Sequence, residues 1–365
     1  MPLKKLQLKA GVNRENTRYT SEGGWYESDK VRFRQGMPEK IGGWQRISTA
    51  TFQGVCRSLH SWVTLVDLTL TSVGTNLKYY LENGGAYYDI TPIRATVTLT
   101  NPFTTANGST TVTVTDAVGG YSDGDFVTFS NASASGGLTL NGEFQITFSS
   151  GNTYTITAAS AASSTATGGG TVTATYQINS GVELEAPLVG WSAGTWGEGT
   201  WGNGGASTES LRIWSQGNFG EDLILGHRGS PLYFWDASEN TPLENPATLL
   251  SAESGASNVP TAQNIILVSD INRFVFCFGA NTLGTTTQDP MLIRWSDQEN
   301  ATNWTPAATT QAGDLRLSRG SEIVAAEQTR QELLVWTDFS VYSLQYVGAP
   351  VVWAAQLVGE NSSIV

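Results

Sequence analysis

The sequence is poor in cysteine and histidine. Its two cysteines, Cys56 and Cys277, exclude a disulfide framework in a chain of 365 residues. Cys277 lies in the apolar run 274–278, where a small thiol packs well, and we expect both cysteines to be reduced core residues. The two histidines, His60 and His227, lack further His, Cys or Asp ligands at short spacing. No metal or cofactor site is predicted.

Several targeting and catalytic motifs are also missing. No charged segment followed by an apolar one opens the chain, and no apolar run approaches the roughly 20 residues of a membrane span. We therefore expect no membrane span, with synthesis and assembly in a reducing cytoplasm. The sequence has neither a phosphate-binding glycine loop followed by Lys-Ser/Thr nor a Gly-x-Ser-x-Gly nucleophile motif. No catalytic residue is predicted, and we expect a protein that is not an enzyme.

Positive charge is absent from a long central stretch. Residues 95–211 contain no Lys or Arg but eight Asp and Glu. Eleven of the 20 Lys and Arg lie in the first 57 positions beside five of the 32 acidic residues, so this segment carries a formal charge of +6 and the rest of the chain −18. Because affinity for phosphates depends on Lys and Arg, we predict that the body binds DNA poorly. The basic segment is predicted to contact an acidic partner.

The composition that is present favours an all-β chain. There are 40 glycines, many Thr and Ser, and few stretches of helix-forming residues. Short apolar runs form four similar units, and the turn 82–85 in the first unit predicts a hairpin. The runs are 62–66, 68–74, 77–81 and 86–92; 211–214, 222–226 and 231–236; 265–269, 273–277 and 291–297; and 323–326, 332–336 and 340–344. Units of four short strands repeated at roughly 45 to 60 residues are typical of β-propeller blades.

The chain divides into four predicted regions. Residues 1–50 form a basic N-terminal arm that is extended rather than a folded unit of its own, and 51–92 form the first blade. Residues 93–178 form an inserted small β-sandwich or barrel, and 179–365 form further blades of a propeller that is incomplete at the C-terminus. Strands are predicted in the insertion at 111–115, 126–129, 144–148, 154–157 and 171–176, with a flexible loop at 158–170.

Three motifs are weighed as binding sites. Ser122-Asp123-Gly124-Asp125 lacks the rest of a calcium loop and is interpreted as a hairpin turn. Ser296-Asp297 with Trp304 resembles the Asp-box turn of sialidases, which is structural even there. Trp191, Trp196 and Trp201 recur every five residues and could stack on sugars, although packing in a seam between blades or subunits is favoured.

The arm carries a family resemblance in a fixed order of features. In chain order, the features are the segment 9–12, the residues Arg14 and Arg18, and the segments 22–25, 30–34 and 36–44. This order resembles the opening of tail nozzle proteins of short-tailed bacteriophages, also called tail tubular protein B, and of the related tail hub or packaged-DNA stabilisation proteins. The specific part covers about 40 residues.

The resemblance implies a structural protein of the virion. It implies a ring of six copies at the distal end of the tail, below the adaptor ring, with DNA leaving through the channel without specific binding. The insertion would face outward, where tail fibres or spikes could dock. We expect the arm to attach to neighbouring subunits or the adaptor through eight residues: Arg14, Arg18, Trp25, Lys30, Arg32, Arg34, Lys40 and Trp44. The alternative is a glycan- or receptor-binding tail component that uses the ladder formed by Trp191, Trp196 and Trp201. A propeller glycosidase is less favoured.

Overall fold

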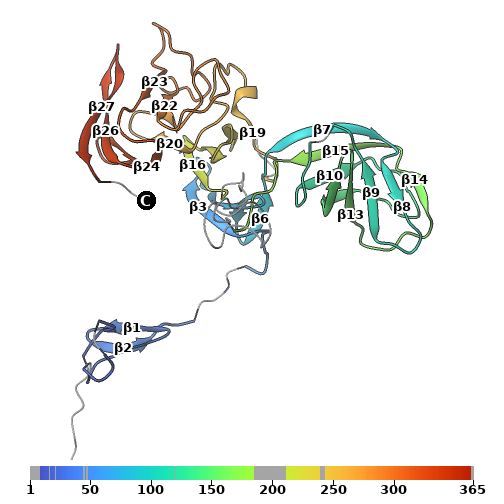
Figure 1. The fold of residues 1–365 in the computed structure, drawn as a ribbon, viewed down its shortest axis with the longest axis horizontal. Coiled ribbons are helices and arrows are strands. Elements are labelled where there is room, and N and C mark those ends of the chain that lie inside the picture. The colour runs from blue at the N-terminus through green and yellow to red at the C-terminus, as the bar shows by residue number, and fades with distance from the viewer. Residues whose placement is uncertain are drawn as a thin grey trace, which may run out of the picture. The chain divides into compact units, whose positions relative to one another are not determined.

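The fold is all-β, as the composition predicts (Figure 1). The computed structural model describes residues 9–15, 17–20, 22–43, 46, 48–118, 120–184, 211–238 and 243–362. Within these ranges the one helix is a short 3-10 turn, η1 (Leu250–Ala252). The same part of the chain has no helix with the length and apolar character needed to cross a membrane. The chain divides into two compact units, Met1–Thr49 and Ala50–Val365.

The first unit is built on one hairpin, β1 (Val31–Arg34) and β2 (Met37–Lys40). Its two-residue turn, Gln35-Gly36, has positive φ at both positions, as a hairpin of this length requires. A parallel bridge joins Val12 to Trp25. The prediction that this segment lacks a folded unit of its own is therefore wrong in part, because local pairing gives it a compact form. None of its described residues is buried.

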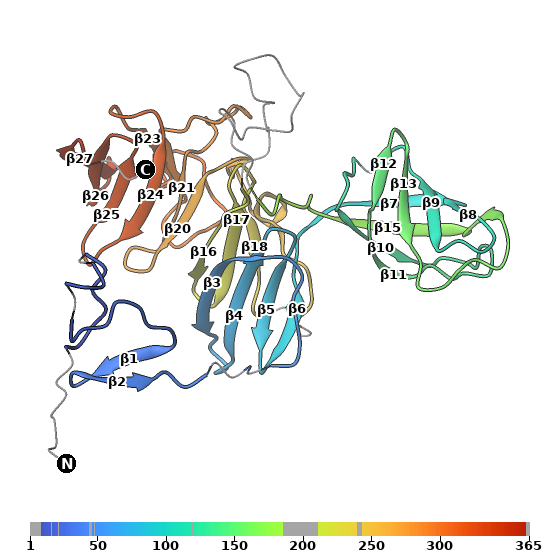
Figure 2. The ribbon, with the colours of Figure 1, turned by 60° about the horizontal axis from the view of Figure 1, so that its bottom comes forward.

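The second unit contains four sheets of four antiparallel strands, each in chain order. Sheet 1 comprises β3 (Cys56–Val63), β4 (Thr69–Thr75), β5 (Tyr79–Asn83) and β6 (Ala86–Asp89); sheet 2, β16 (Trp214–Phe219), β17 (Asp222–His227), β18 (Tyr233–Trp235) and β19 (Thr248–Leu249); sheet 3, β20 (Ile265–Ser269), β21 (Phe274–Phe278), β22 (Leu292–Trp295) and β23 (Gly313–Arg316); sheet 4, β24 (Ile323–Gln328), β25 (Leu333–Thr337), β26 (Ser340–Gly348) and β27 (Val352–Glu360). Figure 2 shows the strands of sheet 1 side by side. The four predicted units and the hairpin between β5 and β6 are confirmed.

Consecutive sheets pack face to face around shared apolar clusters. One cluster joins sheets 1 and 2, a second joins sheets 2 and 3, and a third joins sheets 3 and 4. The first strands β3, β16, β20 and β24 lie next to one another in that order, and all four line a single cavity of about 910 Å³. This arrangement about a common axis is that of propeller blades. Across the described ranges, no apolar cluster joins sheet 4 to sheet 1.

Two blade strands differ from their predicted bounds. The apolar run 62–66 suggests the first strand, but β3 begins at Cys56 and ends at Val63, before a turn. The run 211–214 suggests another, but β16 begins at Trp214 and continues through Gly217. A Cβ at Gly217 would lie 2.9 Å from Cγ2 of Val268 in β20. Glycine is needed there because adjacent inner strands approach closely, and a sequence pattern read alone suggests a turn instead.

The inserted segment forms two facing sheets around one core. The first sheet contains β11 (Gly142–Gln145), β10 (Phe126–Ser130), β15 (Thr171–Gln177) and β7 (Ile93–Thr100); the second contains β12 (Phe148–Ser150), β13 (Thr153–Thr157), β9 (Thr111–Thr115), β8 (Phe103–Thr105) and β14 (Ala166–Gly168). The predicted strand 144–148 is divided, because the chain crosses from one sheet to the other at Ile146. The predicted loop 158–170 is wrong in part, since it contains β14 and buries Ala158 and Ala162.

The two cysteines differ in their surroundings. Cys277 is fully buried in β21, as predicted, and burial raises the pKa of its thiol. Cys56 is exposed, so the prediction that it is a core residue is wrong. It begins β3, where the register with β4 shifts between Cys56 and Ser58 and the strand end lies outside the apolar clusters.

Candidate functional site

The arm brings two predicted arginines together around one carboxylate. Nη2 of Arg14 lies 3.3 Å from Oε1 of Glu27, and Nη2 of Arg18 lies 3.8 Å from Oε2 of the same residue. Both guanidinium groups also lie over the ring of Tyr26, at 6.0 and 5.1 Å from its centroid. All three charged side chains are well exposed, and such ion pairs contribute about 0 to 1 kcal/mol each. The pair of arginines therefore retains a net positive charge at the surface.

The hairpin presents its cations on both faces. Strand alternation and register place Arg32 and Arg34 on one face of the hairpin with Met37 and Glu39, and Nε of Arg32 lies 3.1 Å from Oε2 of Glu39. Lys40 lies opposite Val31 on the other face, and Lys30 precedes β1. In the described part of the arm, Lys30, Arg34 and Lys40 make no ion pair. Their charges are directed to solvent.

Apolar side chains of the arm are exposed beside these charges. Trp25 contacts Phe33 edge to face with ring centroids 6.2 Å apart, and it is only half-buried. Tyr19 is 95% exposed, and Met37 and Ile41 are also exposed. Arginines next to aromatic and apolar side chains make a typical protein-binding surface. The predicted anchor Trp44 and the predicted ladder Trp191, Trp196 and Trp201 lie outside the described residues.

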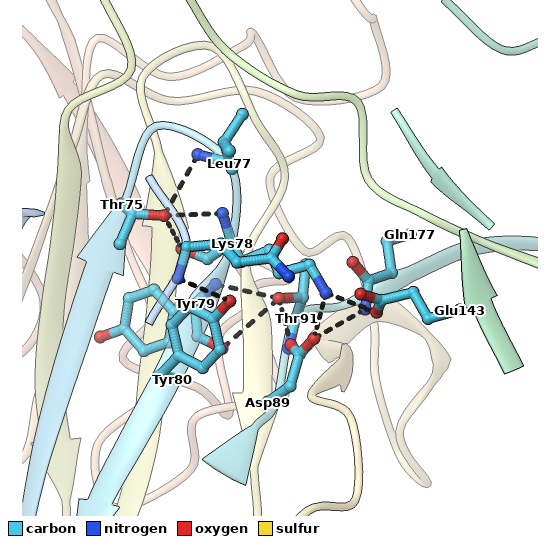
Figure 3. Close-up of polar contacts among 10 residues, drawn as sticks. Thr75, Leu77, Lys78, Tyr79, Tyr80, Asp89, Thr91, Glu143 and Gln177 are labelled. Atoms are coloured by element: carbon cyan, nitrogen blue, oxygen red, sulfur yellow. Dashed lines mark hydrogen bonds and ion pairs between the residues drawn. The ribbon is translucent and has the colours of Figure 1, made fainter. Parts of the chain in front are cut away.

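A second polar cluster lies where the insertion meets sheet 1 (Figure 3). The side chain of Lys78 is 2% exposed, and its Nζ donates a hydrogen bond of 2.7 Å to Oδ2 of Asp89 and another to Oε2 of Glu143. The ammonium lies 4.4 Å from the centroid of the Phe126 ring. Nε2 of Gln177 donates to both carboxylates, at 3.0 Å to Asp89 and 3.4 Å to Glu143.

This cluster joins elements that are distant in sequence. Lys78 and Asp89 flank the hairpin of sheet 1, whereas Glu143 belongs to β11 and Gln177 to β15 of the insertion. Thr91 fixes Asp89, since its backbone N–H donates to Oδ1 at 2.9 Å and its hydroxyl donates to the same atom at 2.5 Å. Within the described residues the ammonium contacts both carboxylates, whereas the buried Oε1 of Gln177 accepts no hydrogen bond. The pairing of opposite charges indicates a structural connection between the insertion and sheet 1.

The predicted turn motifs are also structural. Oδ2 of Asp125 accepts the backbone N–H of Ser122 at 2.9 Å, and Oδ1 accepts that of Ser180 at 2.8 Å. Oδ1 of Asp297 accepts the backbone N–H of Gln311 at 2.7 Å. Trp304 is buried. In the described segments, no group of three or more His, Cys, Asp and Glu side chains could hold a metal ion.

One carboxyl group has a strongly displaced pKa. Burial, with Asp236 and Glu221 nearby, raises the pKa of Asp222 to about 6, although Oδ1 accepts the backbone N–H of Ala237 at 3.0 Å. Because the folded pKa lies above the unfolded one, stability is lost as the pH rises from about 4 to about 6. Asp222 is thus a pH-sensitive group at the start of β17.

The Asp222→Asn variant is expected to raise the melting temperature by a few degrees at pH 7.5 and to leave it unchanged at pH 4. The asparagine oxygen can still accept from Ala237, while the charge that burial and Asp236 disfavour is removed. Thermal unfolding followed by circular dichroism at both pH values measures the effect. Asp270→Asn, at an exposed position, is the control. An equal gain at both pH values would contradict the assignment.

Comparison with solved structures gives several matching chains, one of them a phage protein. The endosialidase of phage phi92 matches with 16% sequence identity and a TM-score of 0.25, over 88% of this chain and 51% of that one. The chain thus spans about half the length of that structure. No protein-family model matches the sequence. No curated protein matches it either.

Proposed function

We propose that this chain is a structural subunit of a bacteriophage tail, of the nozzle type found in short-tailed phages. Its copies assemble into a ring, with six as the expected number, and the basic arm attaches each copy to its neighbour or to the adaptor ring. DNA passes through the channel of the ring as cargo, and the protein performs no catalysis. Its place is the virion, with assembly in the host cytoplasm.

The observation that carries the proposal is the exposed surface of the arm. It combines Lys30, Arg34 and Lys40, which make no ion pair in the described part of the arm, with exposed apolar side chains, and none of its described residues is buried. A surface of this composition is stabilised when a partner covers it. Residues 58–365 carry a formal charge of −18, which makes the body of a second copy an electrostatically matched partner. The order of arm features that resembles nozzle proteins adds independent support.

Charge reversal in the arm is expected to weaken ring assembly about tenfold. The variant Arg34→Glu with Lys40→Glu changes two exposed cations that make no ion pair in the described part of the arm. Removal of residues 1–45 is expected to abolish rings altogether. Light scattering after size-exclusion chromatography measures assembly, and electron microscopy of tails carrying each variant locates the rings.

The matched control reverses two exposed arginines of the body, Arg228→Glu with Arg330→Glu. This variant has the same net charge as the arm variant but is expected to form rings normally. Normal rings from the truncated chain would refute the role of the arm in attachment and would favour the alternative, a glycan- or receptor-binding tail component.

A further inference from the structure

A cavity beside sheet 3 is lined by a buried arginine. The cavity has a volume of about 590 Å³, which is in the range of small-molecule sites. It is lined by the segment that follows η1, by the loop between β21 and β22, and by Arg294 of β22. Arg294 is 3% exposed.

The guanidinium of Arg294 is held by backbone carbonyls alone. Nη1 donates to the carbonyl oxygen of Asn281 at 3.4 Å and Nη2 to that of Asn258 at 2.5 Å. Arg294 forms no ion pair with any carboxylate in the described ranges, although Asp314 is its partner across the strands. Burial lowers its pKa, with Asp314 opposing part of this shift, and a buried cation that forms no close ion pair is unfavourable. An anion in the cavity would relieve this cost.

The walls of the cavity are rigidly positioned. Oδ1 of Asn281 accepts the backbone N–H of Thr261 at 2.8 Å, and Nδ2 donates to the carbonyl of Thr285 at 2.7 Å. Asn281 therefore connects the two segments that face each other across the cavity. The remaining lining is rich in hydroxyl groups, from Ser251, Thr285, Thr286 and Thr287. Hydroxyl and amide groups beside a fixed guanidinium suit a ligand that carries one oxyanion and several hydroxyls.

We infer that the cavity at Arg294 binds the oxyanion of a small hydroxylated ligand, such as the carboxylate of an acidic sugar or a phosphate group. Arg294 contributes the charge, and the threonine loop 285–287 contributes hydrogen bonds to the hydroxyl groups. The site is built from residues of the second unit alone and does not depend on ring assembly.

The test titrates the full-length protein with glucuronic acid, galactose and inorganic phosphate by calorimetry. Glucuronic acid is expected to bind at least about tenfold more tightly than neutral galactose. Binding of phosphate alone would support the oxyanion site and identify phosphate as the source, whereas binding of glucuronic acid alone would identify a carboxylate. Equal binding of galactose and glucuronic acid, or no binding of any of the three, would overturn the inference.

Two variants distinguish loss of the binding site from loss of the folded structure. Arg294→Met is expected to abolish binding, and circular dichroism shows whether it remains folded. Thr286 is exposed, so Thr286→Glu leaves the core intact while placing a competing carboxylate at the cavity. It is expected to weaken binding about tenfold relative to the neutral control Thr286→Gln. Equal affinity in these two variants would contradict the proposed site even if Arg294→Met fails to fold.

Discussion

Replacing Lys78 by Met is expected to lower the free energy of unfolding by about 3 to 5 kcal/mol. The ammonium of Lys78 is the cation between Asp89 and Glu143. Without it, two carboxylates face each other, and Gln177 is left as the donor that contacts both of them. Urea unfolding followed by tryptophan fluorescence measures the change.

The control for Lys78 removes the stranded charges as well. Lys78→Met combined with Asp89→Asn and Glu143→Gln leaves no buried charge, and the asparagine oxygen can still accept from Thr91. This triple variant is expected to recover much of the lost stability. If it unfolds as readily as the single variant, the energetic role of the ion cluster is refuted, and only the packing of Lys78 over Phe126 is left as an explanation.

Replacing Trp214 by Ala is expected to lower the free energy of unfolding by about 3 to 5 kcal/mol. Trp214 begins sheet 2 but packs on sheet 1: its Nε1 donates to the carbonyl of Thr75 at 2.7 Å, and its ring lies 4.7 Å from that of Tyr79. It is 4% exposed, so alanine would leave a cavity between the two sheets. The same urea unfolding experiment measures the loss.

Two comparisons sharpen this expectation for Trp214. Trp214→Phe retains an aromatic ring but loses the hydrogen bond, and is expected to cost about 1 to 2 kcal/mol. Phe339→Ala removes a ring that is 41% exposed and belongs to none of the apolar clusters, and it is expected to change little. A loss below about 1 kcal/mol for Trp214→Ala would mean that sheets 1 and 2 are held together by other contacts.

Local sequence signals predict the elements that depend on local geometry. The hairpin of sheet 1 follows from Gly84 and Gly85, which both adopt positive φ. The extent of β16 could not be predicted in this way. Glycine is required at position 217 by its close approach to Val268, which is 51 positions further along the chain. Local conformational propensity predicts the turn at Gly84 and Gly85, whereas close packing between sheets determines which residues form β16.

The candidate sites also differ in whether they depend on local or on distant contacts. The grouping of Arg14 and Arg18 around Glu27 is local, and the concentration of cations in the arm is evident from the sequence. The contact between Lys78 and Glu143 spans 65 positions and an inserted sheet, so no spacing rule predicts it. Arg294 occupies an ordinary strand position, and only its burial at a cavity distinguishes it from a surface residue.

Among the described residues, the apolar clusters join consecutive sheets and no others, so the body is expected to behave like a linear array. Sheets 2 and 3 are each held on two faces by neighbouring sheets, whereas sheets 1 and 4 each share one such cluster. In an array of this kind, stability is a sum of units and nearest-neighbour interfaces. Opening is therefore expected to begin at a terminal sheet and to advance inward, so that amide protons of sheets 2 and 3 exchange last.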